Sequence, residues 1–294
     1  MRQHFIKIGP YINFLGLQYI QSHKISYLEF GDSDNKNVII CAHGLTRNAH
    51  DFDKIAQALS KDFRVIAINY PGRGDSDYFK IKKHYNYQVY IKDSLFFLNE
   101  LKIKQTTHQI TWLGTSMGGI IGMVLASKYP KLFKNLIIND VGPFISSSPL
   151  VKIGQYAGKT LLFDDLNSAK QHLKLIYSQF GITAEEDWDY LTQHSFKLNF
   201  DGKYKMNYDP DIVYSMKTTS YKPKDVNLWK IWDKIECNLL VVHGAKSEIL
   251  TESIIKEMKR NKNLDLYVVE SAGHAPALIA SDQIDYIQTW VNNV

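Results

Sequence analysis

The residues with the clearest chemical potential are a serine and the two glycines that flank it. Gly114-Thr115-Ser116-Met117-Gly118 has the form G-x-S-x-G, after a run typical of a strand and before a run typical of a helix. In such a turn the serine occupies strained backbone, and bulky residues two positions away on either side would collide. Gly114 and Gly118 avoid that collision. The pattern therefore predicts a nucleophile elbow that exposes the Ser116 hydroxyl for attack on an acyl carbon.

A serine nucleophile needs a general base, which we expect near the end of the chain. Gly273-His274-Ala275-Pro276 follows the last predicted strand, residues 265–269, by a short loop. The other nine histidines occupy no equivalent position. His274 is therefore predicted to accept the proton of Ser116.

Two backbone N–H groups are predicted to bind the oxyanion that forms when Ser116 attacks. His43-Gly44-Leu45-Thr46 follows a predicted strand, residues 38–42, and Met117 follows the serine. The N–H groups of Leu45 and Met117 would be the two donors, each worth about 3 kcal/mol in the transition state. His43 precedes the serine in the chain, and we expect it to brace this loop rather than to act as the base.

Short β-rich runs alternate with longer amphipathic runs, and these elements must position the site. The expected strands are residues 25–30, 38–42, 64–68, 109–113, 135–139, 238–242 and 265–269, and the expected helices are residues 49–60, 87–101, 117–129, 252–260 and 282–291. This alternation predicts an α/β fold with a mostly parallel, doubly wound sheet, formed by residues 1–143 and 225–294.

The alternation stops between residues 144 and 224, where helix-like stretches at 167–180 and 185–194 prevail. We expect this segment to be an inserted helical lid (cap) subdomain. Because it begins after the carboxyl end of a strand, where open α/β sheets bind ligands, the lid should cover the site. Its aromatic side chains are expected to include walls of the pocket: Tyr156, Phe163, Tyr177, Phe180 and Trp188.

Charge and composition narrow the choice of partners. The chain has 294 residues and a formal charge of +5, with 30 lysines but only five arginines. No basic cluster exceeds Lys80, Lys82 and Lys83, so nucleic acid is not an expected partner. No apolar run approaches the roughly 20 residues needed to span a bilayer. Two cysteines are too few for a disulfide framework or a zinc site. A cytoplasmic location is expected. No sequence pattern indicates the oligomeric state.

Taken together, these segments resemble the α/β-hydrolase family, specifically its lidded bacterial serine hydrolases. The likeness extends over about residues 26–291 and is carried by residues 43–48, 71–76, 114–119, 139–143 and 273–276. It is specific for the fold and for triad chemistry but weak for the substrate. The resemblance implies hydrolysis of an ester or related acyl bond, with no metal and no organic cofactor.

The resemblance also implies a triad acid after the penultimate strand, within a Gly-x-x-Ser-Asp segment. Here the segment reads Gly244-Ala245-Lys246-Ser247-Glu248, so Glu248 stands where aspartate is usual. Glutamate also serves in triads of this fold. Asp140, which follows the strand at 135–139, is the alternative, because some members take their acid from that strand end. We predict a triad of Ser116, His274 and Glu248, with Asp140 as the rival acid.

The predicted function is hydrolysis of a small or medium carboxylic ester through an acyl-enzyme. Two alternatives stay open: a carbon–carbon hydrolase, lyase or perhydrolase with the same triad, and a binding protein that senses a ligand on a hydrolase scaffold. Dehalogenases and epoxide hydrolases are disfavoured because they carry aspartate where Ser116 stands. Arg47, after the oxyanion loop, could bind a substrate carboxylate, but the favoured interpretation is that it ties down the loop.

Overall fold

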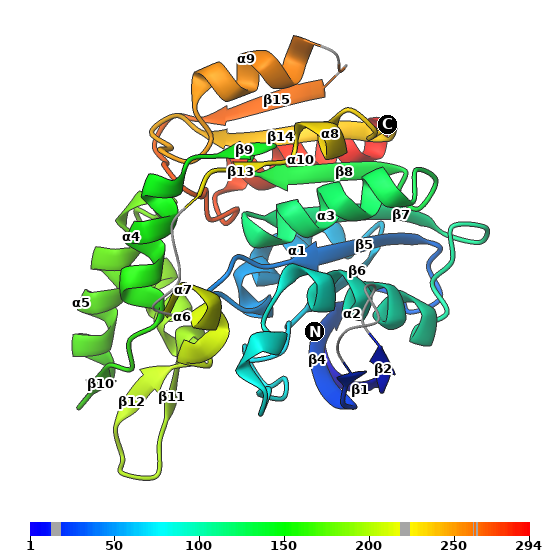
Figure 1. Cartoon of the computed structure of the whole chain (residues 1–294). Coiled ribbons are helices and arrows are strands. Elements are labelled where there is room, and N and C mark those ends of the chain that lie inside the picture. Colours follow the sequence, from blue (N-terminus) through cyan, green and yellow to red (C-terminus); the bar gives the residue numbers. More distant parts are fainter. Residues whose placement is uncertain (13–18, 218–223, 261, 263) are drawn as a thin grey trace.

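A sheet of eight strands crosses the molecule in the order β1-β4-β6-β5-β7-β8-β14-β15 (Figure 1). The computed structural model describes residues 1–12, 19–217, 224–260, 262 and 264–294. The strands are β1 (Arg2–Ile8), β4 (His23–Phe30), β5 (Asn37–Ala42), β6 (Arg64–Ile68), β7 (Gln109–Thr115), β8 (Asn135–Asn139), β14 (Asn238–Gly244) and β15 (Leu264–Val269). β1 and β4 run antiparallel to their neighbours, and the other six are mutually parallel. The predicted α/β fold with a mostly parallel sheet is confirmed.

Helices cover both faces of this sheet (Figure 1). One face carries α2 (Tyr87–Glu100), α3 (Met117–Lys128), α8 (Trp229–Trp232) and α9 (Glu252–Arg260), and the other carries η1 (Ala49–Phe52), α1 (Asp53–Leu59) and α10 (Ser281–Asn293). The buried side chains form two apolar clusters, with Val38 and Ile40 of β5 in one and Ile39 and Cys41 in the other. A strand buried on both faces reads as a continuous apolar run, which is why β5 was recognisable.

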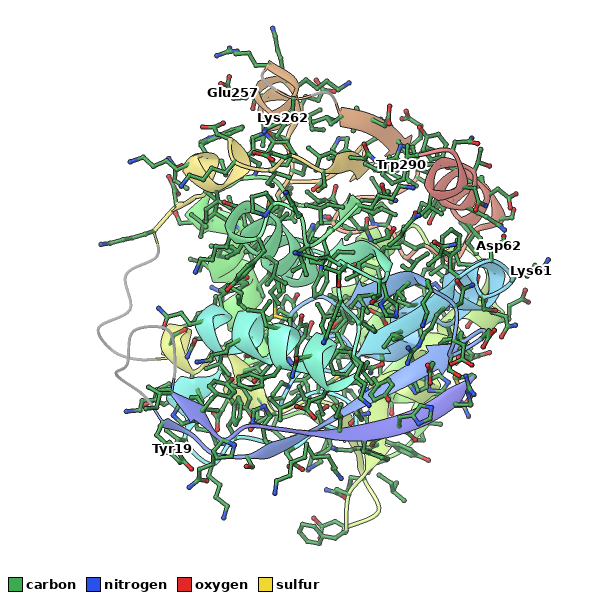
Figure 2. All side chains as sticks on the ribbon, turned by 90° about the vertical axis from the view of Figure 1, so that its right-hand side faces the viewer. Tyr19, Lys61, Asp62, Glu257, Lys262 and Trp290 are labelled. Atoms are coloured by element: carbon green, nitrogen blue, oxygen red, sulfur yellow. The ribbon has the colours of Figure 1, made fainter. Side chains whose placement is uncertain are left out.

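The two edges of the sheet differ in how they are held. The sequence did not predict β1, because this largely exposed edge strand has neither a continuous apolar run nor a regular alternation of polar and apolar residues. β2 (Tyr11–Ile12) and β3 (Tyr19–Ile20) pair with each other between β1 and β4 in the chain, and η2 (Lys82–His84) follows β6. At the other edge the indole N–H of Trp290 donates to Asp265 Oδ2 at 2.7 Å, joining α10 to β15 (Figure 2). Within the described residues, no helix is both long and apolar enough to cross a membrane.

The segment between β8 and β14 forms a layer of its own beside the sheet (Figure 1). It contains β9 (Phe144–Ile145), α4 (Ser147–Ala157), β10 (Leu162–Phe163), α5 (Leu166–Ile176), η3 (Ser178–Phe180), α6 (Glu185–Ser195), β11 (Phe196–Leu198), β12 (Tyr204–Met206), η4 (Pro210–Val213) and α7 (Tyr214–Lys217). β13 (Val226–Asn227) and α8 follow it and lead back to β14. We call residues 144–224 the inserted segment; its residues 218–223 lie outside the described part of the chain.

None of the described strands in the inserted segment joins the eight-stranded sheet. β9 pairs with β13 where the chain leaves and re-enters the core, and β10, β12 and β11 form a small antiparallel sheet. The helical stretches expected at 167–180 and 185–194 correspond to α5 with η3 and to α6. The small sheet was not predicted, because strands of two or three residues carry too little periodicity to be read.

The turn from β7 to α3 leaves no room for side chains at two positions. Ser116 has a φ of 50°, a conformation that residues with a Cβ rarely adopt. A Cβ at Gly114 would lie 2.3 Å from the carbonyl carbon of Gly118, and one at Gly118 would lie 2.0 Å from the carbonyl oxygen of Ala42. Both contacts are with backbone, which cannot move aside cheaply. The two glycines therefore allow β5, β7 and α3 to approach closely around Ser116.

We expect Gly118→Ala to lower the free energy of unfolding by about 3 kcal/mol or more, because the new methyl group overlaps the backbone of β5. Gly154→Ala in α4 is the matched control, since its Cβ would meet only the Met216 side chain, at 3.3 Å from Sδ. That change should shift the free energy by no more than about 1 kcal/mol. Urea denaturation of both variants measures the difference. Equal losses would show that the close approach at Gly118 is not what limits the turn.

Candidate active site

Ser116 and His274 are in contact, although 158 positions separate them in the chain. The Ser116 Oγ lies 2.9 Å from His274 Nε2. Ser116 is the N-cap of α3, and its N–H donates to the Asn139 carbonyl at 3.0 Å. His274 lies in the loop between β15 and α10, and the Asn139 side chain donates to the Pro276 carbonyl of that loop at 2.8 Å. The end of β8 thus holds both the serine turn and the histidine loop.

The carboxylate beside His274 belongs to Asp140, not to Glu248. His274 Nδ1 lies 2.8 Å from Asp140 Oδ2. The Glu248 carboxylate, 59% exposed, instead pairs with Lys152 Nζ at 2.7 Å. The prediction that Glu248 accepts a hydrogen bond from His274 is therefore wrong, and the rival residue occupies that position. From the β14–α9 loop it is Ser247 that turns inward, which leaves the following side chain facing solvent.

The Asp140 carboxylate is fully buried and accepts four hydrogen bonds. Oδ1 accepts from His243 Nδ1 at 3.2 Å and from the Gly244 N–H at 2.9 Å, and Oδ2 accepts from Ser247 Oγ at 2.6 Å and from His274. Burial alone would raise the pKa of this carboxyl, but the hydrogen bonds from His243, His274 and Ser247 outweigh it and lower the pKa. Asp140 is therefore ionised at neutral pH and can only accept.

The contacts of His274 indicate which of its ring nitrogens carries a hydrogen. Because an ionised carboxylate has no proton to donate, the hydrogen between Asp140 and His274 resides on Nδ1. In the neutral ring, the lone pair is therefore on Nε2, which lies 2.9 Å from the Ser116 Oγ. This is the tautomer that a general base toward Ser116 requires.

The loop after β5 lies against the other side of the serine. Met117 is the first residue of α3, so its N–H has no acceptor within the helix, and Leu45 lines the same pocket as Ser116. Neither N–H has a hydrogen-bond partner among the residues that the structure describes. The assignment of both N–H groups to an oxyanion hole stays a prediction.

Arg73 is a buried cation behind this loop, with a role that the sequence did not predict. Its Nε donates to the Leu45 carbonyl at 2.9 Å, and Nη1 donates to the Pro71 carbonyl and to Tyr90 Oη, both at 2.8 Å. Nη2 lies 3.6 Å from the sulfur of Met117. Arg73 is fully buried and forms no ion pair with any described residue. It thus contacts both residues whose N–H groups were predicted to form the oxyanion hole.

His43 is a neutral structural histidine in this arrangement. Nδ1 lies 2.7 Å from the Gly44 carbonyl, and Nε2 accepts from the Tyr70 N–H at 3.1 Å, so the proton resides on Nδ1. Burial, with a smaller effect of the Arg73 charge, lowers the pKa of His43 to about 3. Its contacts are those of a residue that braces the oxyanion loop.

The inserted segment is hydrogen-bonded to the oxyanion loop. Thr46 Oγ1 lies 2.8 Å from Tyr177 Oη, and Asn48 Nδ2 donates to the His194 carbonyl at 2.9 Å. Arg47 donates to Asp51 through Nε and Nη2 and to Ser195 Oγ through Nη1 at 2.7 Å. Its guanidinium is therefore already occupied, which agrees with the interpretation that it ties down the loop.

The histidine loop is attached to the same segment. Gly273 N–H donates to the Gln179 carbonyl at 2.7 Å, and Ala277 N–H donates to the Phe180 carbonyl at 3.1 Å. The pocket next to Ser116 and His274 is thus enclosed by both loops and by the inserted segment. Of the five aromatic residues expected as walls, Tyr156, Tyr177 and Phe180 line it, whereas Phe163 and Trp188 do not.

The other residues that line this pocket are mainly apolar, but they include charged side chains. Aliphatic side chains of the inserted segment contribute: Ile153, Ile176, Ile182 and Leu191. Two cations also line the pocket, and each is paired with a carboxylate, Arg47 with Asp51 and Lys54 with Asp187. The arrangement can bind an apolar acyl or alkyl group and present its carbonyl to Ser116.

Comparisons with known proteins identify the family of the chain. A family profile for the alpha/beta hydrolase fold matches residues 37–154. The 3-hydroxybutyrate-oligomer hydrolase of Cupriavidus necator is 34% identical over 89% of this chain and 90% of its own length. The pimeloyl-[acyl-carrier protein] methyl ester esterase of Wigglesworthia glossinidia brevipalpis is 24% identical over 82% of this chain and 87% of its own.

Solved structures extend the likeness over the whole chain. A structure of a Rickettsia typhi protein is 60% identical, covers 100% of both chains and superposes with a TM-score of 0.94. An alpha/beta hydrolase from Novosphingobium aromaticivorans is 27% identical over 99% of both chains, with a TM-score of 0.84. On these matches, the chain belongs to the alpha/beta hydrolase family as a hydrolase of the kind that acts on ester bonds.

Proposed function

We propose that the protein is a serine esterase that cleaves short oligoesters of 3-hydroxybutyrate through an acyl-enzyme. The observation that carries the reaction is the geometry of His274, whose two ring nitrogens lie 2.9 Å from Ser116 Oγ and 2.8 Å from Asp140 Oδ2. The observation that carries the substrate class is the 34% identity to a 3-hydroxybutyrate-oligomer hydrolase over nearly the whole of both chains.

In the proposed reaction the Ser116 Oγ attacks the ester carbonyl while His274 Nε2 takes its proton. Asp140 stabilises the imidazolium that forms and keeps its ring oriented. The N–H groups of Leu45 and Met117 donate to the oxyanion of the tetrahedral intermediate. His274 then protonates the departing alkoxide, and water releases the acid from Ser116 by the same steps in reverse.

The pocket is compatible with a short, methyl-bearing oligoester. Its aliphatic and aromatic lining can bind the methyl and methylene groups of such a chain. Because both cations that line it are already paired with aspartates, the pocket offers little extra attraction to a terminal carboxylate. We therefore infer recognition of the ester chain rather than of its charged end.

A cytoplasmic location stays a prediction from the sequence.

The acid should be distinguishable by a pair of substitutions. Asp140→Asn should lower kcat by about 10⁴-fold, because an amide neither fixes the productive tautomer of His274 nor stabilises its charged form. Glu248→Gln should leave kcat within about twofold, because its exposed carboxylate forms a surface ion pair with Lys152 and does not contact His274. Steady-state kinetics on a p-nitrophenyl ester, with circular dichroism to verify folding, measures both. A folded Asp140→Asn variant with near-normal kcat would exclude Asp140 as the triad acid.

The nucleophile should be detectable without knowledge of the substrate. A fluorophosphonate should label the protein on Ser116, because the hydroxyl lies within hydrogen-bond distance of His274 Nε2, the proposed base. Ser116→Ala should abolish both labelling and ester turnover, with a loss of about 10⁶-fold in kcat. Tryptic mass spectrometry locates the adduct. An adduct on another serine would contradict the assignment.

The substrate class is tested with defined oligomers. The protein should release monomer from the dimer and trimer of 3-hydroxybutyrate. The methyl ester of the trimer should differ from the free acid by less than about tenfold in kcat/KM, because no unpaired cation binds the terminal carboxylate. Chromatography of the products measures both. Cleavage of p-nitrophenyl butyrate without cleavage of the oligomers would support the esterase activity but exclude 3-hydroxybutyrate oligomers as the substrate.

A further inference from the structure

Three potential metal ligands meet where the inserted segment contacts the core. His50 lies in η1, Asp53 is the first residue of α1, and His194 is near the end of α6. One ligand atom from each lies within 4.8 Å of the others. This group is separate from the Ser116–His274–Asp140 contacts, although His50 also lines the rim of the pocket.

The polar atoms of this cluster are only partly satisfied by the protein. His50 Nδ1 lies 2.7 Å from Asp53 Oδ2, and Tyr190 Oη also donates to that oxygen. The other oxygen, Asp53 Oδ1, is buried and has no hydrogen-bond partner in the structure. Asp53 is only 8% exposed, so this oxygen has lost its hydration without gaining a donor, which is costly for a carboxylate. A bound cation would remove that cost.

The two imidazoles of the cluster lie against each other. The rings of His50 and His194 stack, with centroids 3.9 Å apart and planes inclined by 24°. Because the lone pair of an imidazole lies in the plane of its ring, one of the two stacked rings must rotate for both to direct a nitrogen at a shared ion. The neighbouring cation Arg47 is neutralised by its ion pair with Asp51, which reduces its repulsion of a metal.

We propose that His50, Asp53 and His194 form a site for a divalent transition-metal ion, Zn²⁺ by its donor set, that fastens the inserted segment to the core. Two imidazoles and one carboxylate are donors that Zn²⁺ accepts, and three protein ligands leave one position for water. A tetrahedral ion holds its ligand atoms about 3.4 Å apart. The widest separation must therefore contract by at most about 1.4 Å, which side-chain rotation can supply.

Occupation of this site has a direct consequence for the pocket. His194 belongs to the inserted segment and His50 to the core, and His50 and Tyr190 line the pocket at the place where the two meet. A metal bond across this boundary restrains α6 against η1 and α1. Zn²⁺ should therefore slow the movement of substrate and product past the rim and lower turnover without contacting Ser116.

The test measures metal binding directly, so it does not depend on the proposed function. Isothermal titration at pH 7.5 should show one Zn²⁺ per chain, and Co²⁺ should give the intense visible bands of a tetrahedral N/O site. His194→Gln and Asp53→Asn should each weaken Zn²⁺ binding at least tenfold. His172→Gln is the matched control, because His172 lies in α5 of the same segment but outside the cluster. It should bind Zn²⁺ as the wild type does.

The possible results separate cleanly. The proposal is overturned if the wild type binds no Zn²⁺ below about 100 μM. It is equally overturned if a folded His194→Gln variant retains wild-type affinity, or if His274→Gln removes the binding that His194→Gln leaves intact. Loss of binding in His194→Gln with retention in His172→Gln supports it, even if Asp53→Asn proves too unstable to purify.

Discussion

The buried carboxylate of Asp140 is the interaction on which the remainder of the site depends. It follows β8 directly, and its four donors come from the end of β14, the loop after β14 and the loop after β15. Isolated in the interior, an ionised carboxylate would be strongly unfavourable. Here the same hydrogen bonds that keep it ionised also fix the positions of three chain segments. The same hydrogen bonds therefore both stabilise the Asp140 charge and orient His274.

The inserted segment contributes to that geometry as well as to the walls of the pocket. It donates or accepts hydrogen bonds on the oxyanion loop at Thr46, Arg47 and Asn48, and on the histidine loop at Gly273 and Ala277. The two loops come from opposite sides of Ser116. A segment bonded to both determines how far apart they stand, and thus the width of the opening above the serine. In the proposed esterase, a change in the inserted segment would therefore alter both the size of substrate that the pocket accepts and the positions of the catalytic groups.

The sequence indicated the sheet and the serine turn because each rests on local constraints. Continuous apolar runs such as 38–42 arise from burial on both faces, and Gly114 and Gly118 from the lack of space around Ser116. The acid could not be chosen in the same way. Glu248 and Asp140 both follow strand ends, and only the side-chain directions, with Ser247 turned inward and Glu248 outward, separate them. Such directions depend on loop conformation, which carries no periodic signal.

The role of Arg73 was beyond sequence reasoning for a related reason: its partners are backbone carbonyls and a tyrosine, which no charge pattern reveals. Arg73 is buried and pairs with no carboxylate among the described residues. This can be understood by considering Arg73 together with Asp140. The proposed reaction creates a negative oxygen at the loop that Arg73 supports and a positive imidazole beside Asp140. Each developing charge then faces a fixed charge of opposite sign that is already buried and held by hydrogen bonds. In the proposed reaction, preorganisation of this kind would stabilise the charge-separated state without reorganising solvent, and it would offset the cost of burying Arg73 and Asp140 near one serine.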